Sequence, residues 1–428
     1  MRTGALVKDI RISVSCRSIA DDLRQSGSGR RFRLRNGLCK HINWTVPTLI
    51  CPIQYTMVSI GLIALATVAS AAPTERLSLD DLYVTDPPSS VRPYVIPHLS
   101  EANGITIGSQ AYRFYITGPS SGYAFTLMGT SAPGSSALGV LPHIHQTHYE
   151  NFYNFKGRYQ LWAQGADDKT QAARQLTAGD YGSVPRNTTH TFQILDPDTE
   201  MTGVIVPGGF EDLFYALGTN FTWATNTPYK PEVVNDSAAA GPDSSGISGL
   251  EKFDVYAQLD FNPRRDLVNG SAPNDSTWHT CNNTLGSKVG EPYFVANGYG
   301  PKYLNSQYGY QIVQPLVGLD QSADVNYTLS TISINGARNR TEDGAPTFKT
   351  GAAGFQIVEG VLNLKIGDYP VATLYEGDVA FIPANTTYKY WSPVAFTKVL
   401  YVASGSNGVD QQLIGKGKEW GFVTFPTA

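Results

Sequence analysis

Four residues that could bind a transition metal lie close together in the first half of the chain: His143, His145, Glu150 and His190. Side chains two apart in a strand point the same way, so His143 and His145 would present both imidazoles to one interior. Glu150 follows on the next pleat or turn, and His190 would come from a strand after the turn at residues 187–189. Three imidazoles and one carboxylate suit copper, iron, manganese, nickel or zinc. The spacing therefore predicts one metal site.

The remaining histidines of this region do not share the pattern. His148 falls off the strand alternation, so we expect it beside the site or at its rim rather than among the ligands. His98 and His279 have no neighbouring residues of ligand type, and we assign both a structural role. No signature of a cysteine enzyme surrounds Cys281, which we expect to be a small filler residue.

The elements that position these residues occur twice. Residues 178–190 match residues 376–388 at a separation of 198, and residues 156–161 match residues 359–364 at a separation of 203. A period this long indicates a duplicated domain rather than a solenoid. We therefore expect two domains of one fold.

The second half serves as an internal control for the metal prediction. At these separations the four ligand positions become residues that bind metal poorly, namely Pro346, Phe348, Ala353 and Tyr388. The repeat persists although every ligand is gone. The ligands are therefore not needed to build the fold, and we interpret their presence in the first half as functional.

Composition points to strands. The 428 residues include 42 Gly, 26 Pro, 24 Tyr and 18 Phe, with short β-branched and aromatic runs cut by Gly and Pro. Alternating runs at residues 158–162, 355–358 and 379–382 predict strands of an antiparallel sandwich or barrel.

We expect an all-β protein with residues 73–225 as the first domain and residues 286–428 as the second. Between them, residues 226–285 are expected to be a linker, because residues 226–249 are rich in Pro, Asn, Ser, Ala and Gly.

The amino-terminal region predicts export. Residues 58–69 are a run of apolar and small residues, followed by an A-x-A pattern at residues 69–71. This run is shorter than the roughly 20 residues of a membrane-spanning helix. Since Met57 stands directly before it, we interpret residues 57–72 as a signal peptide and residues 1–56 as a non-native extension. The alternative is a genuine long segment with an internal signal-anchor.

Other features agree with a secreted protein that has no membrane attachment after cleavage. Asn-x-Ser/Thr sequons are frequent, and those predicted as glycosylation sites are Asn220, Asn235, Asn269, Asn274, Asn282, Asn326 and Asn339. Two further sequons, at Asn187 and Asn385, lie beside predicted turns and are expected to escape modification. The net charge of -4 offers no basic surface for DNA or RNA, which excludes nucleic acid as an expected partner.

Two local motifs resemble those of the cupin superfamily. They are His143-x-His145-x4-Glu150-x6-Gly157 and Gly179-x5-Pro185-x-Asn187-x2-His190, with Asn187 where a Gly is usual and Ile194 where an Asn is usual. Longer runs make the chain similar to the secreted fungal quercetin 2,3-dioxygenases, two-cupin enzymes with one metal. These runs are residues 141–145, 148–152, 179–187, 196–214 and 300–310.

This resemblance implies two tandem cupin domains, each a jelly-roll β-barrel. It also implies one Cu²⁺ per chain, held by His143, His145, Glu150 and His190, although other divalent transition metals would suit the same ligands. The substrates would be a flavonol and dioxygen, and the products a depside and carbon monoxide. Family positions for substrate contacts fall on Tyr112, Thr130, Phe152, Phe192, Met201 and Ile205. Glu150 would also act as the catalytic base that accepts the flavonol 3-hydroxyl proton.

Two other functions remain open from the sequence. One is a germin-like, oxalate-degrading manganese enzyme, which would need polar or basic groups around a small dianion. The other is a non-enzymatic storage or binding bicupin, which would not require a complete set of metal ligands. A homodimer is expected from the general frequency of dimers alone.

Overall fold

The computed structural model describes residues 77–221, 228–229, 249–273, 278–280, 282–338 and 341–427. Within these ranges strands predominate, and the α-helices are short: α2 (Gly118–Ser121), α3 (Glu211–Leu217) and α5 (Val409–Gly415). No helix among the described residues is both long and apolar enough to span a membrane. The expected extension, signal peptide and Cys281 lie outside the described residues.

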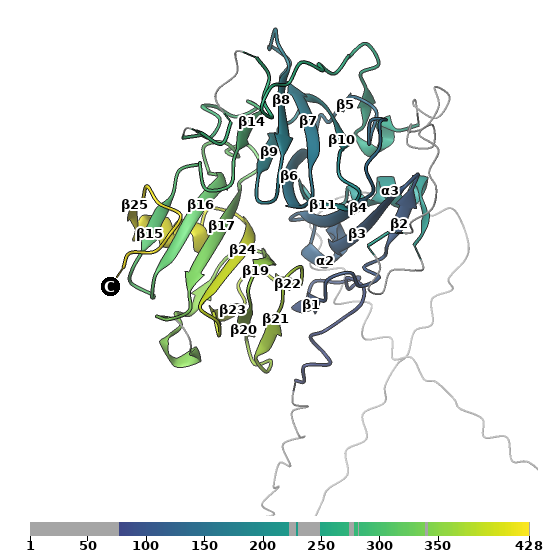
Figure 1. Ribbon diagram of the computed structural model, residues 1–428. Coiled ribbons are helices and arrows are strands. Elements are labelled where there is room, and N and C mark those ends of the chain that lie inside the picture. The colour runs from purple at the N-terminus through teal and green to yellow at the C-terminus, as the bar shows by residue number, and fades with distance from the viewer. Residues whose placement is uncertain are drawn as a thin grey trace, which may run out of the picture. The chain divides into compact units, whose positions relative to one another are not determined.

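The first half forms a barrel of two antiparallel sheets, one of eight strands and one of five (Figure 1). The larger sheet contains, in spatial order, β12 (Thr219–Asn220), β2 (Ile105–Ile107), β3 (Gln110–Ile116), β4 (Thr126–Ala132), β11 (Thr199–Val206), β6 (Tyr149–Lys156), β9 (Tyr181–Val184) and β14 (Tyr293–Val295). The smaller sheet contains β13 (Tyr256–Ala257), β5 (His143–Ile144), β10 (Thr189–Ile194), β7 (Tyr159–Gln164) and β8 (Ala172–Leu176).

The second half repeats this design with sheets of eight and four strands. The larger sheet contains β1 (Tyr94–Ile96), β22 (Val379–Ile382), β19 (Ala353–Glu359), β24 (Phe396–Ser404), β17 (Tyr327–Asn335), β16 (Gln311–Val317), β15 (Tyr303–Asn305) and β25 (Lys418–Glu419). The smaller sheet contains β18 (Phe348–Lys349), β23 (Thr387–Trp391), β20 (Leu362–Ile366) and β21 (Ala372–Leu374). The predicted all-β fold of two tandem cupin barrels is confirmed.

Each half of the chain contributes one strand to the barrel formed by the other half. β1 belongs to the first half of the chain but pairs with β22 of the second barrel, with Val95 opposite Ala380. In return β14 pairs with β9 of the first barrel, with Phe294 opposite Gly182. The domain limits expected at residues 73–225 and 286–428 therefore need correction, because backbone pairing places each first strand in the opposite barrel.

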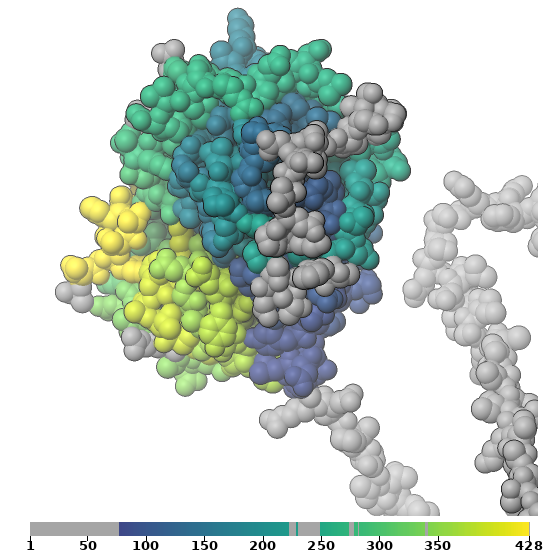
Figure 2. Space-filling view, turned by 45° about the vertical axis from the view of Figure 1, so that its right-hand side comes forward, coloured from purple at the N-terminus to yellow at the C-terminus, as the bar shows by residue number. Residues whose placement is uncertain are grey.

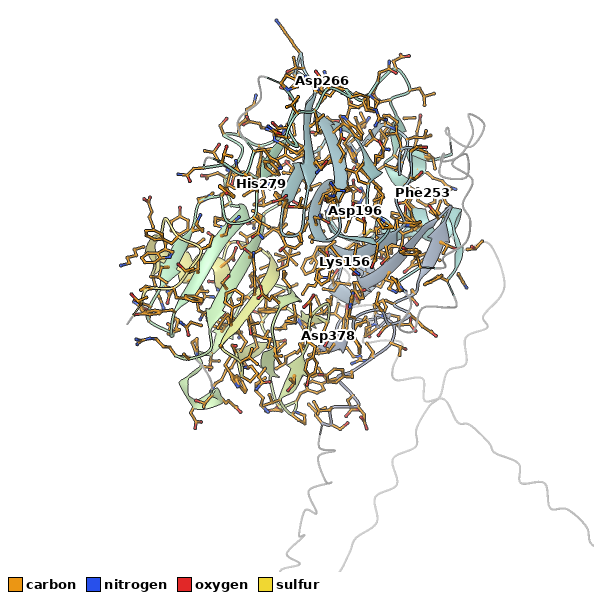
Figure 3. All side chains as sticks on the ribbon, viewed as in Figure 1. Lys156, Asp196, Phe253, Asp266, His279 and Asp378 are labelled. Atoms are coloured by element: carbon orange, nitrogen blue, oxygen red, sulfur yellow. The ribbon has the colours of Figure 1, made fainter. Side chains whose placement is uncertain are left out.

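Matching aspartates anchor the two exchanged strands. Asp378, labelled in Figure 3, accepts the backbone N–H of His98, just beyond β1, at 2.8 Å. Asp180 accepts the backbone N–H of Asn297, just beyond β14, at the same distance. An apolar layer, including Tyr115, Leu316, Phe381 and Leu400, packs residues of both halves into one cluster. The two barrels therefore share a core instead of standing apart on a flexible tether.

Part of the expected linker also belongs to the first barrel. From Leu250 onward the chain folds back, and β13 pairs with β5. Leu250 and Val255 are buried in an apolar cluster with residues of β3 and α3, and Trp278 is buried in another cluster of this barrel. In the space-filling view the green-teal part of the chain lies against the blue part of the first barrel (Figure 2). The prediction of residues 226–285 as a linker is therefore corrected from Leu250 on, because those apolar side chains gain more by burial than by exposure.

The register of the strands refines the repeat. His190 pairs with His143, and Tyr388 pairs with Phe348, so Phe348 is the structural equivalent of His143. The backbone N–H of Asn187 bonds to the carbonyl of His145, as that of Asn385 bonds to Thr350, so Thr350 is equivalent to His145. The expected equivalents Pro346 and Phe348 are therefore wrong by two residues. The cause is a connection to the third ligand position that is two residues shorter in the second barrel.

Candidate metal centre and its pocket

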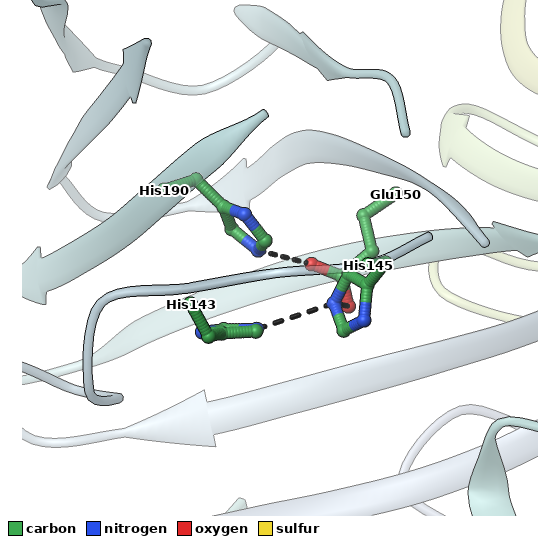
Figure 4. Close-up of side chains that lie close together, drawn as sticks. All are labelled: His143, His145, Glu150 and His190. Atoms are coloured by element: carbon green, nitrogen blue, oxygen red, sulfur yellow. Dashed lines mark hydrogen bonds and ion pairs between the residues drawn. The ribbon is translucent and has the colours of Figure 1, made fainter. Parts of the chain in front are cut away.

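The four predicted ligands meet inside the first barrel (Figure 4). His143 comes from β5, His145 from the residue after it, Glu150 from β6 and His190 from β10. One ligand atom of each lies within 4.8 Å of the others. The three imidazoles are buried, and the carboxylate of Glu150 is 12% exposed. Two strands of the smaller sheet and one strand of the larger sheet thus converge on one point.

Hydrogen bonds fix which nitrogen of each imidazole faces this point. The Nδ1 atoms of His143, His145 and His190 lie 2.7, 2.7 and 3.0 Å from backbone carbonyl oxygens, which can only accept. Each Nδ1 therefore donates a proton, and each Nε2 faces inward, where it presents a free lone pair when the ring is neutral. This is the orientation that metal-binding histidines need.

The separations between ligand atoms fit a shared cation. The Nε2 atoms of His143 and His145 are 3.2 Å apart, and when both rings are neutral they are two acceptors facing each other. The Glu150 carboxylate lies 3.6 Å from Nε2 of His145 and 2.8 Å from Nε2 of His190. Two atoms that each lie about 2.1 Å from one ion stand about 3–4 Å apart. The donor set therefore fits a transition metal, which would remove the repulsion between the facing lone pairs.

Burial and the charges within the cluster shift the pKa values of its members in different directions. Burial, with help from His190 and His145, lowers the pKa of His143 well below its ordinary value, so this ring is neutral. Burial alone would raise the pKa of Glu150, but the charge and hydrogen bonds of His145 and His190 hold it well below its usual range. For His145, burial lowers the pKa, yet Glu150 and Asp254 together outweigh burial and raise it, so a metal bound here would displace a proton from this ring. The site thus holds an ionised carboxylate beside imidazoles.

An apolar cavity opens beside the metal centre. It has about 1170 Å³ of empty space, counting its open mouth, and His143 and Glu150 are part of its lining. All six residues predicted to contact substrate line it: Tyr112 on β3, Thr130 on β4, Phe152 on β6, Phe192 on β10, and Met201 and Ile205 on β11. The structure therefore brings the predicted ligands and the predicted pocket residues to one place.

A second wall of the cavity was not predicted from the sequence. It consists of residues at or on α3 and of residues that follow it in the chain: Phe210, Leu213, Phe214, Leu217, Leu250, Val255 and Ala257. The ring of Phe214 lies 4.6 Å from that of Tyr112. The helical spacing of the first four apolar residues, three or four apart, was the signal that could have located this helix.

His148 lies outside the ligand set, as expected. Its Nδ1 is 2.8 Å from a carboxylate oxygen of Asp254, and it does not belong to the group of converging ligand atoms. His98 and His279 also lie apart from the metal centre. They pair with Glu200 and Asp180, respectively, at 3.0 and 2.9 Å.

Of the predicted glycosylation sites, those within the described residues are exposed: Asn220, Asn269, Asn282 and Asn326. Asn187 and Asn385 are also exposed, each in a turn with positive φ. The other three candidates, Asn235, Asn274 and Asn339, lie outside the described residues.

Comparison with known proteins assigns the family. Quercetin 2,3-dioxygenase of Aspergillus japonicus is 61% identical to this chain over 346 residues, which cover 81% of the chain and 98% of that protein. The chain belongs to the quercetin 2,3-dioxygenase family. A second member of this family, from Bacillus subtilis, is 30% identical over 135 residues, covering 32% of the chain and 37% of that protein. No family model matches the chain.

Solved structures with similar folds are more distant. The oxalate decarboxylase of Lactobacillus farciminis, solved as a formate complex, has a TM-score of 0.47 and 15% identity, covering 76% of this chain and 89% of that chain. The oxalate decarboxylase of Bacillus subtilis, solved at pH 4.6, has a TM-score of 0.45 and 14% identity, covering 76% and 79%.

Proposed function

We propose that this protein is a copper-dependent quercetin 2,3-dioxygenase, which opens the heterocyclic ring of a flavonol with dioxygen. Both oxygen atoms enter the depside product, and one ring carbon leaves as carbon monoxide. The observation that carries the proposal is the joining of a three-histidine, one-glutamate centre to an apolar cavity, in a chain of this family.

The character of the cavity favours a flavonol. A planar polyphenol needs aromatic and aliphatic walls with a few polar groups, and the lining is of this kind. An oxalate dianion would instead need a cationic partner. No lysine or arginine is found among the described residues that line the cavity. The pocket therefore supports the flavonol substrate over the germin-like alternative.

The proposed resident metal is one Cu²⁺ bound by His143, His145, Glu150 and His190, since imidazole and carboxylate sites generally hold copper more tightly than other divalent metals. When bound, the cation would lower the pKa of the flavonol 3-hydroxyl and so favour the electron-rich anion that reacts with oxygen. Other divalent transition metals suit the same ligands.

Glu150 is positioned to handle the proton of that hydroxyl. Its carboxylate lines the cavity and is ionised, because the neighbouring imidazoles hold its pKa well below the usual range against the effect of burial. It can therefore accept the hydroxyl proton and orient the substrate by the same hydrogen bond. Burial, reinforced by Glu150, raises the pKa of Tyr112, so its phenol stays neutral in the pocket wall.

The direct test is aerobic incubation of the secreted protein with quercetin. Loss of the flavonol's visible absorbance, release of carbon monoxide and the metal content are measured on the same sample. Carbon monoxide with about one copper per chain supports the proposal. A metal-loaded protein that releases no carbon monoxide refutes it and moves the assignment to oxalate chemistry or to ligand binding.

The role of Glu150 is tested separately by Glu150→Gln. This variant keeps the shape of the side chain but cannot accept a proton as a carboxylate does. We expect turnover to fall by about 10²–10⁴-fold, while the circular dichroism spectrum and much of the metal are retained. A fully active variant would exclude Glu150 as the base.

We also propose that the protein is secreted and glycosylated after removal of a signal peptide. Four exposed sequons, at Asn220, Asn269, Asn282 and Asn326, support this. Amino-terminal sequencing of the native protein and peptide mapping test it. A native terminus before Met57 would overturn the predicted start, and unmodified asparagines would overturn glycosylation. Light scattering tests the expected homodimer.

A further inference from the structure

One carboxylate holds the turn between the second and third predicted metal ligands. Asp254 accepts hydrogen bonds from the backbone N–H groups of Gln146, Thr147 and His148, at 2.9, 2.8 and 2.9 Å. The same carboxylate accepts the Nδ1 hydrogen of His148 at 2.8 Å. Three consecutive backbone N–H groups and one imidazole thus donate hydrogen bonds to a single side chain.

The backbone of the same residue orients a ligand. The carbonyl oxygen of Asp254 lies 2.7 Å from Nδ1 of His145, the contact that turns Nε2 of this ring toward the metal centre. The equivalent carbonyl partners of the other two histidines lie two residues before each of them, at Leu141 and Thr188. His145 therefore differs from the other two histidines, because its orientation depends on a residue 109 positions away in the chain.

The segment around Asp254 is itself held in place. Leu250 and Val255, on either side of it, are buried and line the substrate cavity. Asp254 has φ of +63°, a left-handed conformation that aspartate and asparagine adopt more readily than most residues. Its side chain is only 11% exposed, which strengthens its hydrogen bonds.

We infer that Asp254 is a positioning residue of the metal centre, which sets the orientation of His145 and the course of the turn to Glu150. The inference rests on the proposed metal site but not on the identity of the substrate. Partners of metal-bound histidines typically affect metal affinity by about 10–100-fold. Because Leu250 and Val255 flank Asp254, one segment builds both the pocket wall and the support of His145.

Two substitutions of Asp254 test its carboxylate while the backbone carbonyl stays in place. Asp254→Asn keeps the size of the side chain and the left-handed backbone, but its amide NH₂ must face some of the donors now served by the carboxylate. Asp254→Gly removes the side chain and keeps the backbone carbonyl at a favourable φ. The matched control is Asp266→Asn in the same segment. Asp266, labelled in Figure 3, is an exposed carboxylate that pairs with Arg264.

The readouts are Cu²⁺ affinity by competition with a chelator, the electron paramagnetic resonance spectrum of the copper, and the melting temperature without metal. We expect both Asp254 variants to bind copper about 10–100-fold more weakly and to change the spectrum, while Asp266→Asn matches the wild type. A role in folding alone would lower the melting temperature and leave affinity and spectrum unchanged, which would overturn the inference.

This outcome is distinct from failure of the proposed function. If the wild-type protein binds copper but releases no carbon monoxide from quercetin, the proposed reaction fails and the copper measurements on Asp254 still decide the positioning role. If both Asp254 variants keep wild-type affinity and spectrum, only the positioning role fails.

Discussion

The two barrels share a backbone design and differ at every position that could bind a metal. Where the first barrel has His143, His145, Glu150 and His190, the strand register of the second places Phe348, Thr350, Ala353 and Tyr388. In the second barrel the Tyr388 hydroxyl lies 3.2 Å from the Thr350 hydroxyl and 3.4 Å from that of Tyr401. A hydroxyl network thus replaces the ligands, and the fold forms without them.

The interiors differ for an equally local reason. Gly203 on β11 lines the cavity of the first barrel, and Phe152 is its partner on β6. The equivalent pair in the second barrel is Tyr401 and Phe355, whose rings are 4.9 Å apart and fully buried. One glycine in place of a tyrosine therefore helps to leave space for a ligand. Barrel architecture and ligand capacity are thus separate properties.

The largest expected effect comes from removing a ligand in one barrel and its equivalent in the other. His190→Ala should lose most of the metal, and turnover should fall by about 10³-fold or more, since a bound metal contributes several kcal/mol. Elemental analysis and carbon monoxide release measure both. Tyr388→Phe is the control: it removes two hydroxyl contacts at a cost of about 1 kcal/mol, with full metal content. Equal metal loss in both variants would contradict the conclusion that the two barrels differ in metal binding.

Filling the cavity should have the next largest effect. Gly203→Phe places a ring where Tyr401 stands in the second barrel, so we expect kcat/KM for quercetin to fall by about 10²-fold or more, as misplacement of substrate does. Copper content should stay unchanged, because the four ligands remain. Gly203→Ala is the graded control with a smaller loss, since an added Cβ would lie 3.1 Å from Met128. Unchanged kinetics in Gly203→Phe would show that this wall does not bound the substrate.

Removing a buried ring from the second barrel should lower the stability of the protein rather than its catalytic rate. Tyr401→Ala removes a fully buried ring, and we expect the free energy of unfolding to fall by about 3–5 kcal/mol, measured with urea. Tyr401→Phe is the control, since it loses only the hydroxyl that accepts the Val409 N–H at 3.0 Å, at a cost of about 1 kcal/mol. A stable Tyr401→Ala protein would mean that the second barrel tolerates a cavity as the first does.

The smallest effect is expected where the second half touches the metal-binding turn. Asp324 accepts the Tyr149 hydroxyl at 3.0 Å and lies 3.4 Å from Arg186, whose Nε donates to the Thr147 carbonyl. Because Asp324 is exposed on its loop, Asp324→Asn should cost less than about 1 kcal/mol, with kcat/KM near the wild-type value. A large fall in kcat/KM would show that the second barrel takes part in shaping the site.

The local pattern of the sequence was sufficient to identify the four side chains that converge and to predict the fold class. Alternation places His143 and His145 on one side, and the expected strands at residues 158–162, 355–358 and 379–382 correspond to β7, β19 and β22. Side-chain period and residue chemistry are properties of neighbouring residues, so they can be deduced without knowing the path of the chain.

Long-range packing decided the rest. The exchange of β1 and β14, the wall made by α3, and the hydrogen bonds of Asp254 to the turn after His145 all join segments that local patterns do not connect. The equivalents of the first two ligands were misplaced by two residues, because only strand register reveals a shorter connection. Residue types and spacing therefore determined which groups could bind a metal. The tertiary structure decided what orients them and where the pocket lies, because these depend on contacts between residues far apart in the chain.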